Sequence, residues 1–264
     1  MLISMGACPF CGGGNNTPCF ATYDNGYHCF TCGKKKSTDR AQYAYRPMLK
    51  TLDKDLTLPE HTQNTCEFSP SVLKWLYSYY VYDDLIKKYN IAYAPFTEFG
   101  QFKGESLILP VVLDGELISY QRRFFPNKQF ITKGNKTSPF FIKCHNSVTI
   151  VLVEDYISAV RVGQHANVIC LHGVHVLYDV SKLIQSLNMN IEIWLDPDEA
   201  GQTASKELLA KLTKDAQSSA KYRAFAVREQ RTITIRSTER QPKEYSDYEI
   251  QQILRGDNET VRAV

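Results

Sequence analysis

The sequence contains no apolar run of the roughly 20 residues needed to cross a bilayer, and its first residues lack the apolar stretch of a secretory signal. It has no internal repeat and no low-complexity stretch. It also lacks a Gly-x4-Gly-Lys-Ser/Thr phosphate loop, because residues 134–138 have neither the first glycine nor the spacing. These absences exclude a membrane-spanning protein and an ATP-driven motor, and we expect a soluble cytoplasmic protein.

A strong net charge is absent as well. With 31 Lys and Arg against 28 Asp and Glu, the formal net charge is only +3. That balance permits a nucleic-acid partner without indicating one, since affinity for phosphates depends on local clusters of cations. The 264 residues, 43% of them hydrophobic, suffice for one good core and a small additional module.

Changes in composition divide the chain into five segments. Residues 1–37 are rich in Gly and Cys, and residues 38–66 have the polar composition of a linker. Residues 67–146 combine helical and strand-like patterns, residues 147–230 alternate short apolar runs with helical stretches, and residues 231–264 form a polar C-terminal extension. We expect a small N-terminal module joined by a linker to a larger region of helices and strands.

The segment after the linker predicts short helices and then a β-hairpin. Apolar residues recur at helical spacing from Pro70, ahead of a strand-like run at residues 91–93. Residues 106–113 and 116–123 have strand-like patterns and flank Asp114-Gly115, a two-residue turn of the kind that joins antiparallel strands. We therefore expect a hairpin centred on this turn.

The chain from Thr149 predicts a mostly parallel sheet covered by helices. Short apolar runs alternate with helical stretches, which is the pattern of a βαβαβαβ series. The strands are expected at residues 149–153, 168–171, 191–195 and 223–227, and the helices at 156–164, 180–187 and 202–212. One further helix is expected around Ile250 and Leu254.

Four of the eight cysteines form two Cys-x-x-Cys pairs near the N-terminus. Cys8 and Cys11 are separated from Cys29 and Cys32 by 17 residues, a spacing that lets two turns each supply two thiolates to a tetrahedral zinc ion. Four protein ligands leave no position for water, so the zinc is expected to be structural. A module this short has almost no core, and the metal would be needed to hold it folded.

Alternatives to this ligand set remain at this stage. The two pairs also fit a redox-active dithiol, although no thioredoxin-like pattern accompanies them. Either Cys19 or His28 could replace one of the four ligands, but Cys19 falls outside the paired spacing and His28 is expected to be exposed beside Cys29. We favour the four paired cysteines.

Aromatic and basic residues follow the zinc ligands closely. Tyr27 and His28 offer stacking faces, and three lysines begin at Lys34. Stacking faces beside cations suit single-stranded nucleic acid. The alternative is that the aromatic side chains only cover the zinc knuckles, and this is the favoured interpretation for Phe30.

Carboxylates follow two of the predicted parallel strands. Glu154 comes directly after the first strand, and Asp196 and Asp198 flank Pro197 after the third. Because the carboxyl ends of parallel strands form the ligand-binding crevice of such sheets, we expect these acids to converge. Their repulsion calls for a divalent cation, and hard oxygen ligands select Mg²⁺ or Mn²⁺. An Asp-x-Asp alone is often only a turn or a helix cap, and its pairing with Glu154 is what favours a metal site.

The runs Val151-Leu152-Val153-Glu154-Asp155 and Ile193 to Gly201 closely resemble the TOPRIM domain of primases, topoisomerases and some nucleases. Together with the four-cysteine ribbon, nearly the whole chain resembles the primase half of the phage primase-helicase family. The resemblance implies an α/β fold with an N-terminal zinc ribbon, a linker, a mixed α+β subdomain and a Rossmann-like TOPRIM sheet.

The same resemblance implies an activity and its partners. The expected enzyme is a nucleotidyltransferase, a DNA primase that makes short RNA primers from NTPs on single-stranded DNA during phage replication, in the cytoplasm of the host. Glu154, Asp196 and Asp198 would hold catalytic Mg²⁺ or Mn²⁺ in addition to the structural zinc. A separate replicative helicase and a DNA polymerase are the expected protein partners.

Basic residues that contact the nucleotide and the primer-template in this family correspond to residues around the hairpin. The resemblance assigns catalytic roles to Arg122 and Lys128, with Arg123 and Lys133 as supporting nucleic-acid contacts. Successive strand residues point to opposite faces, so only one of Arg122 and Arg123 is expected to point into the site. A solvated basic strand is the alternative.

The sequence departs from the family pattern in two places. The usual Glu-Gly-x-x-Asp has Asp155 in place of the glycine and Ser158 in place of the second acid, and Gln241 stands where another acid is usual. Asp155 is a hypothetical substitute ligand. One ion held firmly, with another shared with the nucleotide phosphates, would be compatible with these losses.

Two other functions fit the same residues. A TOPRIM nuclease would use the acids to hydrolyse phosphodiesters, although the zinc ribbon and basic hairpin argue against it. A non-catalytic zinc-ribbon DNA-binding replication factor is the second, and the missing acids keep it open.

Overall fold

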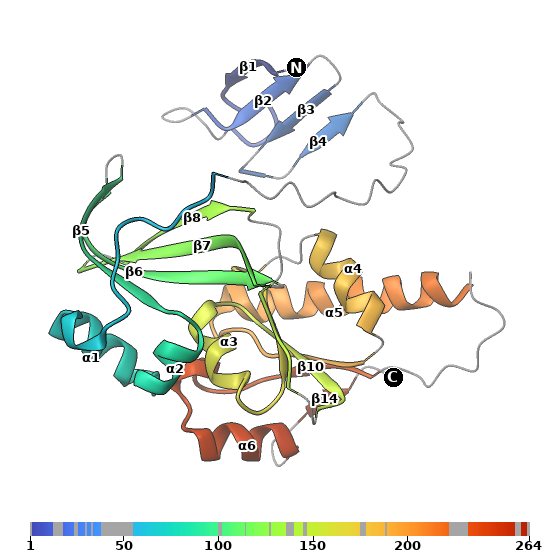
Figure 1. Cartoon of the computed structure of the whole chain (residues 1–264). Coiled ribbons are helices and arrows are strands. Elements are labelled where there is room, and N and C mark those ends of the chain that lie inside the picture. Colours follow the sequence, from blue (N-terminus) through green and yellow to red (C-terminus); the bar gives the residue numbers. More distant parts are fainter. Residues whose placement is uncertain are drawn as a thin grey trace. The chain divides into compact units, whose positions relative to one another are not determined.

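The computed structural model describes two compact units of the chain, Met1–Thr51 and Leu52–Val264 (Figure 1). The described residues are 2–12, 18–23, 26–29, 31–32, 34–37, 55–99, 102–113, 115–126, 128–135, 140–144, 147–174, 178–187, 189–221, 232–256 and 260–262.

The first unit is a small antiparallel sheet of four strands in chain order. Its strands are β1 (Leu2–Gly6), β2 (Phe20–Tyr23), β3 (Gly26–Cys29) and β4 (Lys35–Ser37). The buried cluster of this unit consists of Cys8, Cys19 and Cys29, with Phe20 packed against it. Among the described residues this core is small, and units with so little apolar core commonly depend on a bound metal for their stability.

The second unit begins with short helices. The 3-10 helix η1 (Thr65–Glu67) precedes α1 (Pro70–Ser78) and α2 (Asp83–Lys88). The Ser69 hydroxyl accepts a hydrogen bond from the backbone N–H of Val72 and so caps α1, whose first residue is a proline with no N–H to satisfy. The predicted helices ahead of the strand-like run are confirmed.

The predicted hairpin is part of a four-stranded antiparallel sheet. The strands follow chain order: β5 (Ala92–Phe99), β6 (Phe102–Leu113), β7 (Glu116–Phe124) and β8 (Gln129–Gly134). Gly115 has φ 84°, which explains the glycine in the turn between β6 and β7. The two faces of this sheet pack differently: Leu107 belongs to the large core, whereas Ile108 belongs to a small cluster covered by Leu56 and Leu58.

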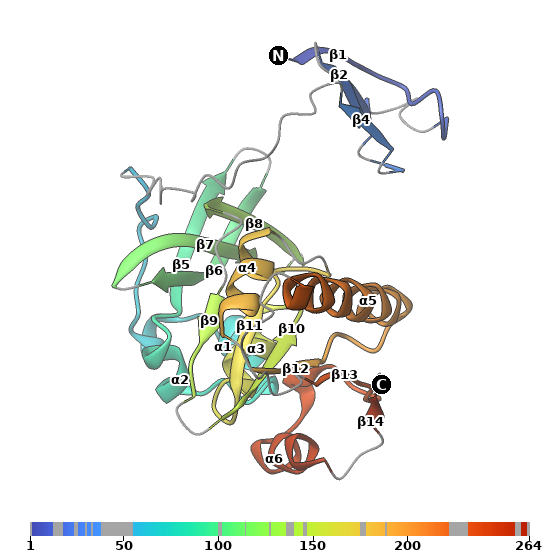
Figure 2. The ribbon, with the colours of Figure 1, turned by 90° about the vertical axis from the view of Figure 1, so that its right-hand side faces the viewer.

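A six-stranded sheet forms the rest of the second unit (Figure 2). The strand order is β14-β13-β12-β10-β11-β9, with four parallel central strands and an antiparallel strand at each edge. The strands are β9 (Phe140–Ile142), β10 (Thr149–Val153), β11 (Asn167–Cys170), β12 (Asn190–Ile193), β13 (Ile233–Arg236) and β14 (Thr260–Arg262). The helices are α3 (Tyr156–Val162), α4 (Tyr178–Leu187), α5 (Glu199–Lys221), η2 (Pro242–Glu244) and α6 (Asp247–Arg255). The prediction of a mostly parallel sheet is confirmed.

Two details differ from the sequence-based expectation. The predicted strand at residues 223–227 lies outside the described residues. The fourth parallel strand that the structure describes is β13, within the segment expected to be only a polar extension. Ile233 and Ile235 alternate with polar residues there, which is a strand pattern too short to be noticed in a polar stretch.

One large apolar core joins the two sheets of the second unit. It contains Leu107 and Leu109 of β6 together with Val151 and Val153 of β10. The Tyr156 hydroxyl, fully buried in this core, donates a hydrogen bond to the Pro110 carbonyl 2.9 Å away. The hairpin sheet and the parallel sheet therefore share one apolar core.

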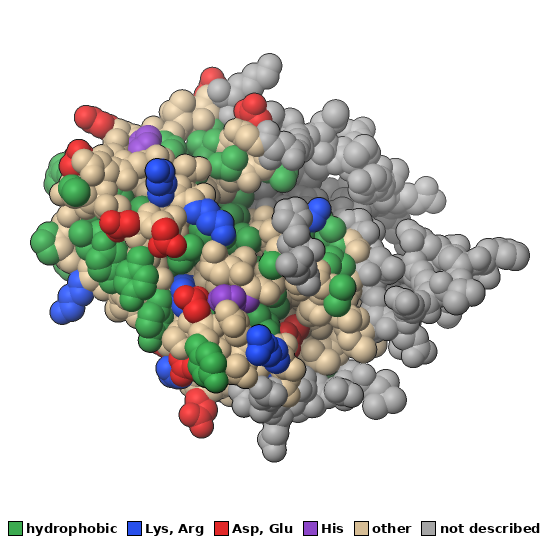
Figure 3. Space-filling view, turned by 60° about the horizontal axis from the view of Figure 1, so that its bottom comes forward, with side chains coloured by type: hydrophobic (Ala, Val, Ile, Leu, Met, Phe, Trp, Pro, Cys, Tyr) green, Lys and Arg blue, Asp and Glu red, His purple; other side chains and the backbone are tan. Residues whose placement is uncertain are grey.

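Figure 3 shows the face that carries α1, α2 and α6, where basic, acidic and apolar side chains are interspersed. Tyr77 of α1, Tyr82 at the start of α2 and Tyr248 of α6 are exposed. None of the described helices is both long enough and apolar enough to cross a bilayer.

Candidate functional site

The four paired cysteines form a candidate metal site in the first unit. Their Sγ atoms all lie within 4.8 Å of one another, with Cys8 and Cys32 separated by 3.9 Å and Cys11 and Cys29 also by 3.9 Å. All four are free thiols, so no disulfide competes with metal binding. Four thiolates at this separation fit a tetrahedral structural zinc ion, as the spacing predicts.

Backbone N–H groups of the two turns donate hydrogen bonds to two of the cysteine sulfurs, which favours their thiolate form. The N–H of Phe10 donates to the Cys8 sulfur and the N–H of Cys32 donates to the Cys29 sulfur, each at 3.4 Å. The Cys32 N–H is the main cause that lowers the pKa of Cys29 to about 6. Gly12 has φ 66°, a conformation that glycine adopts without strain, directly after the first pair.

A fifth cysteine lies beside this cluster. The sulfur of Cys19 is 3.9 Å from that of Cys29, and Cys19 is buried. The pairing of Phe20 with Cys29 across β2 and β3 brings it there. Sequence spacing gives no signal for this contact, because it depends on strand pairing.

The predicted nucleic-acid contacts of the first unit lie near a partly exposed aromatic cluster. The ring of Tyr27 lies 5.3 Å from that of Phe10 and 5.1 Å from that of Phe20, and the Lys34 ammonium lies 4.1 Å from the centroid of Phe10. Phe10 is 47% exposed, so part of this surface remains open to stacking. His28 is half-buried in β3, and Phe30 lies outside the described residues.

The predicted carboxylates stand at the ends of neighbouring strands in the second unit. Glu154 directly follows β10, and Asp196 follows β12, which pairs with β10 in parallel. Glu154 and Asp196 are both half-buried, whereas Asp198 is exposed. The structure therefore brings these three acids to one edge of the sheet.

Burial and mutual repulsion raise the pKa values of two of these acids. Burial is the main cause that raises the pKa of Glu154 to about 7, and the charges of Asp196, Asp155 and Asp198 add to it. Burial likewise raises the pKa of Asp196 to about 6; Lys243 opposes this shift, while Asp155 and Asp198 add to it. Carboxylates that perturb one another in this way share one crevice, and a divalent cation would relieve the repulsion.

One buried carboxylate oxygen of Asp196 also favours a bound cation. The Oδ1 of Asp196 is buried and has no hydrogen-bond partner among the described residues. A buried oxygen left without a donor is costly unless a cation satisfies it. Among the described residues only the four cysteines bring three or more ligand atoms within 4.8 Å of one another, so the three acids do not form a cluster that tight. Mg²⁺ is commonly held by one or two carboxylates together with waters and substrate phosphates.

Asp198 caps a helix and also lines a cavity. Its Oδ1 accepts a hydrogen bond from the N–H of Gly201 at 2.8 Å, and its carbonyl accepts one from the N–H of Gln202 at 2.9 Å. Asp198 therefore caps α5, and the cap fixes its place beside Asp196. It also lines a cavity of about 610 Å³ at the start of α5.

Asp155 is engaged by the protein itself. Its Oδ1 accepts from the backbone N–H groups of Ile157 and Ser158, at 2.9 and 3.1 Å, and so caps α3. Its Oδ2 accepts from the Ser158 hydroxyl at 2.6 Å and from the Lys243 ammonium at 3.0 Å. Both carboxylate oxygens of Asp155 thus accept hydrogen bonds from the protein, which argues against the hypothesis that Asp155 replaces a missing metal ligand.

Lys243 is the site residue that sequence reasoning missed. In the sequence, this segment shows only that Gln241 replaces an acid, and no motif assigns a role to the lysine two positions later. Its side chain is only 13% exposed beside the carboxylates. The contact joins residues 88 positions apart, and nothing in the sequence pairs them.

The two predicted arginines lie on opposite faces of β7, as strand alternation predicts. Arg122 pairs with Ile108 in β6, on the face covered by Leu56 and Leu58, and its guanidinium donates to the Ser106 hydroxyl at 3.1 Å. Arg123 pairs with Leu107, on the face of the large core. Arg123 is therefore the arginine on the side of the parallel sheet.

Both arginines are buried, with 4% of Arg122 and 7% of Arg123 exposed. The Arg123 guanidinium lies 4.3 Å from the ring centroid of Trp75 and 3.9 Å from that of Phe125. Burial lowers the pKa of both guanidinium groups. Of the predicted basic residues, Lys128 is exposed before β8 and Lys133 is half-buried within it.

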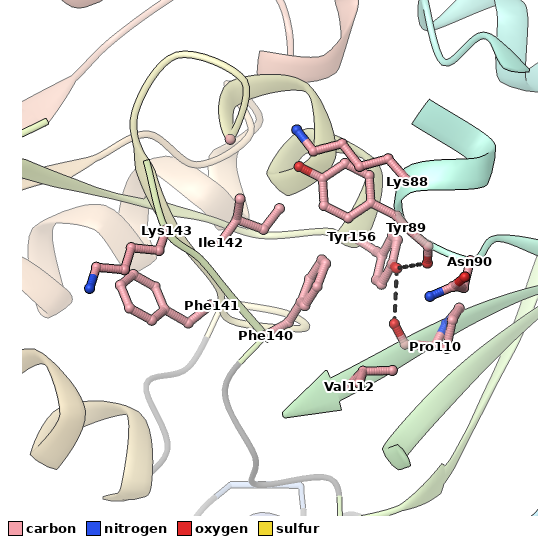
Figure 4. A pocket seen from close by; sticks show the side chains of 11 residues that line it. Lys88, Tyr89, Asn90, Pro110, Val112, Phe140, Phe141, Ile142, Lys143 and Tyr156 are labelled. Atoms are coloured by element: carbon pink, nitrogen blue, oxygen red, sulfur yellow. Dashed lines mark hydrogen bonds between the residues drawn. The ribbon is translucent and has the colours of Figure 1, made fainter. Parts of the chain in front are cut away.

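A smaller cavity of about 260 Å³ lies where α2, β6, β9 and α3 meet (Figure 4). The rings of Phe140 and Tyr156 stack there, with centroids 4.3 Å apart, and Lys88 and Lys143 belong to the lining. None of the predicted site residues lines this cavity. The cavity is lined by aromatic, apolar and lysine side chains, and none of the three carboxylates belongs to its lining.

Residues 152–230 match the Toprim-like family, a range that includes Glu154, Asp196 and Asp198. The zinc-binding and RNA polymerase domains of the Aquifex aeolicus primase superimpose with a TM-score of 0.56 at 15% identity, over 100% of this chain and 81% of that one. The primase fragment of the bacteriophage T7 primase-helicase matches with a TM-score of 0.49 at 15% identity, covering 97% of this chain and 98% of that one. The DnaG catalytic core matches with a TM-score of 0.48 at 14% identity, covering 66% and 67%. No curated protein sequence matches this chain.

The chain therefore contains a Toprim-like domain, and its fold is that of the zinc-binding and RNA polymerase domains of the Aquifex aeolicus primase. The predicted resemblance is confirmed at the level of domain and fold.

Proposed function

We propose that this chain is a DNA primase that makes short RNA primers from NTPs on single-stranded DNA. The observation that carries the proposal is the meeting of Glu154, Asp196 and Asp198 at the ends of adjacent strands, where burial and mutual repulsion raise the pKa values of Glu154 and Asp196. A four-cysteine module in the same chain and the shared fold support it. The RNA product, the single-stranded DNA template and the divalent metal ion are all parts of this proposal.

In this proposal Glu154 and Asp196 hold a divalent ion through one oxygen or more each, and Asp198 holds it from the α5 cap. Mg²⁺ bound there would supply electrostatic stabilisation for the in-line attack of a primer 3′-OH on the α-phosphate of an NTP, in which the bond to the β-phosphate breaks and pyrophosphate leaves. The exposed ammonium of Lys128 contacts phosphates of the nucleotide or template. The cap at Asp198 keeps the carboxylates in place between turnovers.

We propose different roles for Arg122 and Arg123, because their side chains lie on opposite faces of β7. Arg123 lies on the face of the large core and contributes positive charge toward the crevice. The buried guanidinium of Arg122 bonds to Ser106, so we propose that it acts by holding β6 and β7 together rather than by touching a phosphate. Lys133 supports the same sheet edge from β8.

In the first unit, we propose that zinc holds the aromatic cluster of Phe10, Phe20 and Tyr27 in the shape that stacks on template bases, with the Lys34 ammonium neutralising a phosphate. His28 lies in the same strand as Tyr27 and is proposed as an additional contact. A helicase that opens the duplex and a DNA polymerase that extends the primer are the proposed partners.

The test is incubation of the zinc-loaded chain with mixed-sequence single-stranded DNA, labelled NTPs and Mg²⁺. We expect short RNA products, reduced at least 100-fold by Asp196→Asn and by Glu154→Gln. Asp84→Asn, which changes an exposed carboxylate of α2, serves as the control and should leave the yield unchanged. Degradation of labelled DNA without NTPs would indicate a nuclease instead, and DNA binding with neither activity would indicate a non-catalytic replication factor.

A further inference from the structure

Lys243 is held in place by a rigid turn. It lies in η2, which packs against α3, and the turn is closed by a hydrogen bond of 2.9 Å from the Gln241 N–H to the Glu244 carboxylate. The carbonyl of Tyr245, which follows the turn, accepts a hydrogen bond from the buried guanidinium of Arg161 in α3. The backbone after Lys243 is therefore anchored to α3, and the backbone before it is held by the hydrogen bond that closes the turn.

The ammonium of Lys243 ends among carboxylates. It lies 3.0 Å from the Oδ2 of Asp155, and it is the basic group that opposes the raised pKa values of Asp196 and Glu154. Burial alone would lower the pKa of Lys243, but Asp155 and Asp196 outweigh it and raise that pKa. The ammonium is thus a permanent positive charge at neutral pH.

Few carboxylate oxygens at the strand ends remain for a metal ion, because Asp155 is bound to Lys243. Asp155 already accepts four hydrogen bonds, from two backbone N–H groups, the Ser158 hydroxyl and Lys243. The other acids described around Asp196, with its buried Oδ1, are Glu154, Asp198 with one oxygen used in the α5 cap, and Glu244, whose carboxylate accepts the Gln241 N–H that closes η2. These are enough for one hydrated divalent ion, which commonly takes one or two carboxylates together with substrate phosphates.

We propose that Lys243 is a built-in cation of the carboxylate centre, and that the centre binds one divalent ion, with the lysine ammonium in the position that a second ion would otherwise fill beside Asp155. This inference deepens the proposed function and rests on it for the identity of the substrate. An ammonium has three N–H donors, and Asp155 uses one of them. Among the described residues the ammonium makes no other hydrogen bond and lies 5.5 Å from the ring centroid of Tyr79, so its other two donors can reach phosphate oxygens of the nucleotide, which makes Lys243 a substrate-positioning residue.

The test counts ions directly and does not depend on primer synthesis. Zinc-loaded wild-type chain is titrated with Mn²⁺ at pH 7.5, and free Mn²⁺ is measured by electron paramagnetic resonance. We expect one Mn²⁺ per chain, lost in Asp196→Asn. Lys243→Met frees Asp155, and we expect it to bind two Mn²⁺ with the broadened spectrum of two neighbouring ions.

Two further variants control the result. Lys243→Arg keeps the positive charge and should bind one ion, and Lys206→Met, which removes an exposed lysine of α5, should match the wild type. Two ions in the wild type, two in Lys243→Arg, or an unchanged single ion in a folded Lys243→Met would overturn the inference. If Lys243→Met does not fold, the counts for wild type and Lys243→Arg decide the question alone.

Failure of the inference is distinguishable from failure of the proposed function. A chain that binds one Mn²⁺ but makes no primers has the built-in cation without the primase activity. A chain that makes primers while binding two ions is a primase without the built-in cation. With primer synthesis established, the positioning role predicts a KM for NTP at least tenfold higher in Lys243→Met than in Lys243→Arg, and equal KM values would contradict it.

Discussion

The α-carbon of Gly201, in the first turn of α5, lies so close to the carbonyl oxygen of Asp196 that a Cβ at this position would overlap it. The nearest atoms all belong to the backbone of Asp196 and cannot rotate away as the end of a side chain would. The N–H of the same glycine donates to Asp198. Gly201 therefore contacts the backbone of Asp196 and the side chain of Asp198, and this explains a glycine inside a helix, where it is otherwise unfavourable.

Gly201→Ala is expected to displace Asp196 and weaken divalent-ion binding. The overlap must be relieved by a shift of the strand end or of α5, at a cost of about 1–3 kcal/mol in the free energy of unfolding. Mn²⁺ titration should show at least a tenfold weaker affinity. Gly6→Ala is the matched control, because a Cβ there meets nothing within 4 Å. An unchanged Mn²⁺ affinity in Gly201→Ala would show that the carboxylates are not fixed by this contact.

Metal-free protein is expected to lose stability as the pH rises from about 5 to 7. The folded pKa values of Glu154 and Asp196 are about 7 and about 6, above the ordinary values of 4.5 and 3.8, so the folded state binds more protons in this range. Glu154→Gln removes most of the effect and should stabilise the metal-free protein at pH 8 by roughly 1–3 kcal/mol, with little change at pH 4.5. Urea unfolding at both pH values measures this.

The same protons compete with the metal. Mn²⁺ affinity should therefore fall as the pH drops from 8 to 6, because the ion must displace protons from Glu154 and Asp196. Glu60→Gln, at an exposed carboxylate, should follow the wild type in both experiments. A pH-independent affinity over this range would contradict the raised pKa values.

The sequence predicts those parts of the site that depend on local spacing or on strand ends. The two Cys-x-x-Cys pairs predict the zinc cluster because each pair lies within one turn. Glu154 and Asp196 are predictable because apolar strands precede them and parallel strands end at the same edge. The turn at Gly115 is likewise encoded in two residues.

The parts that sequence reasoning missed depend on contacts between distant segments. Lys243 reaches Asp155 only through the packing of η2 on α3, and Cys19 reaches Cys29 only through the pairing of β2 with β3. The burial of Arg122 depends on the chain around Leu56 and Leu58, which was expected to be a linker. Charge and motif alone assign such residues a function without showing whether they are accessible.

The buried ion pair between β12 and β13 provides a test of the parallel sheet. The Arg236 guanidinium bonds to the Glu192 carboxylate at 2.5 Å, and both residues are only 6% exposed. Arg236→Met leaves a buried carboxylate without a partner and should destabilise the protein by about 3–5 kcal/mol in urea unfolding. The double variant Glu192→Leu/Arg236→Met should recover most of this loss, because no charge then remains buried. A single variant that costs under 1 kcal/mol would show that β13 does not pair with β12 as described.

Zinc removal should unfold the first unit and spare the second. The first unit has a buried cluster of three cysteines, whereas the second has two large apolar cores of its own. We expect one zinc per chain, released by Cys29→Ser, with loss of amide-exchange protection in β1 to β4 and an unchanged melting temperature of the second unit. Cys19→Ser is the matched control: Cys19 also lies near Cys29 but is not one of the four clustered ligands, so this variant should keep its zinc. Loss of zinc from Cys19→Ser with retention in Cys11→Ser would replace Cys11 by Cys19 in the ligand set.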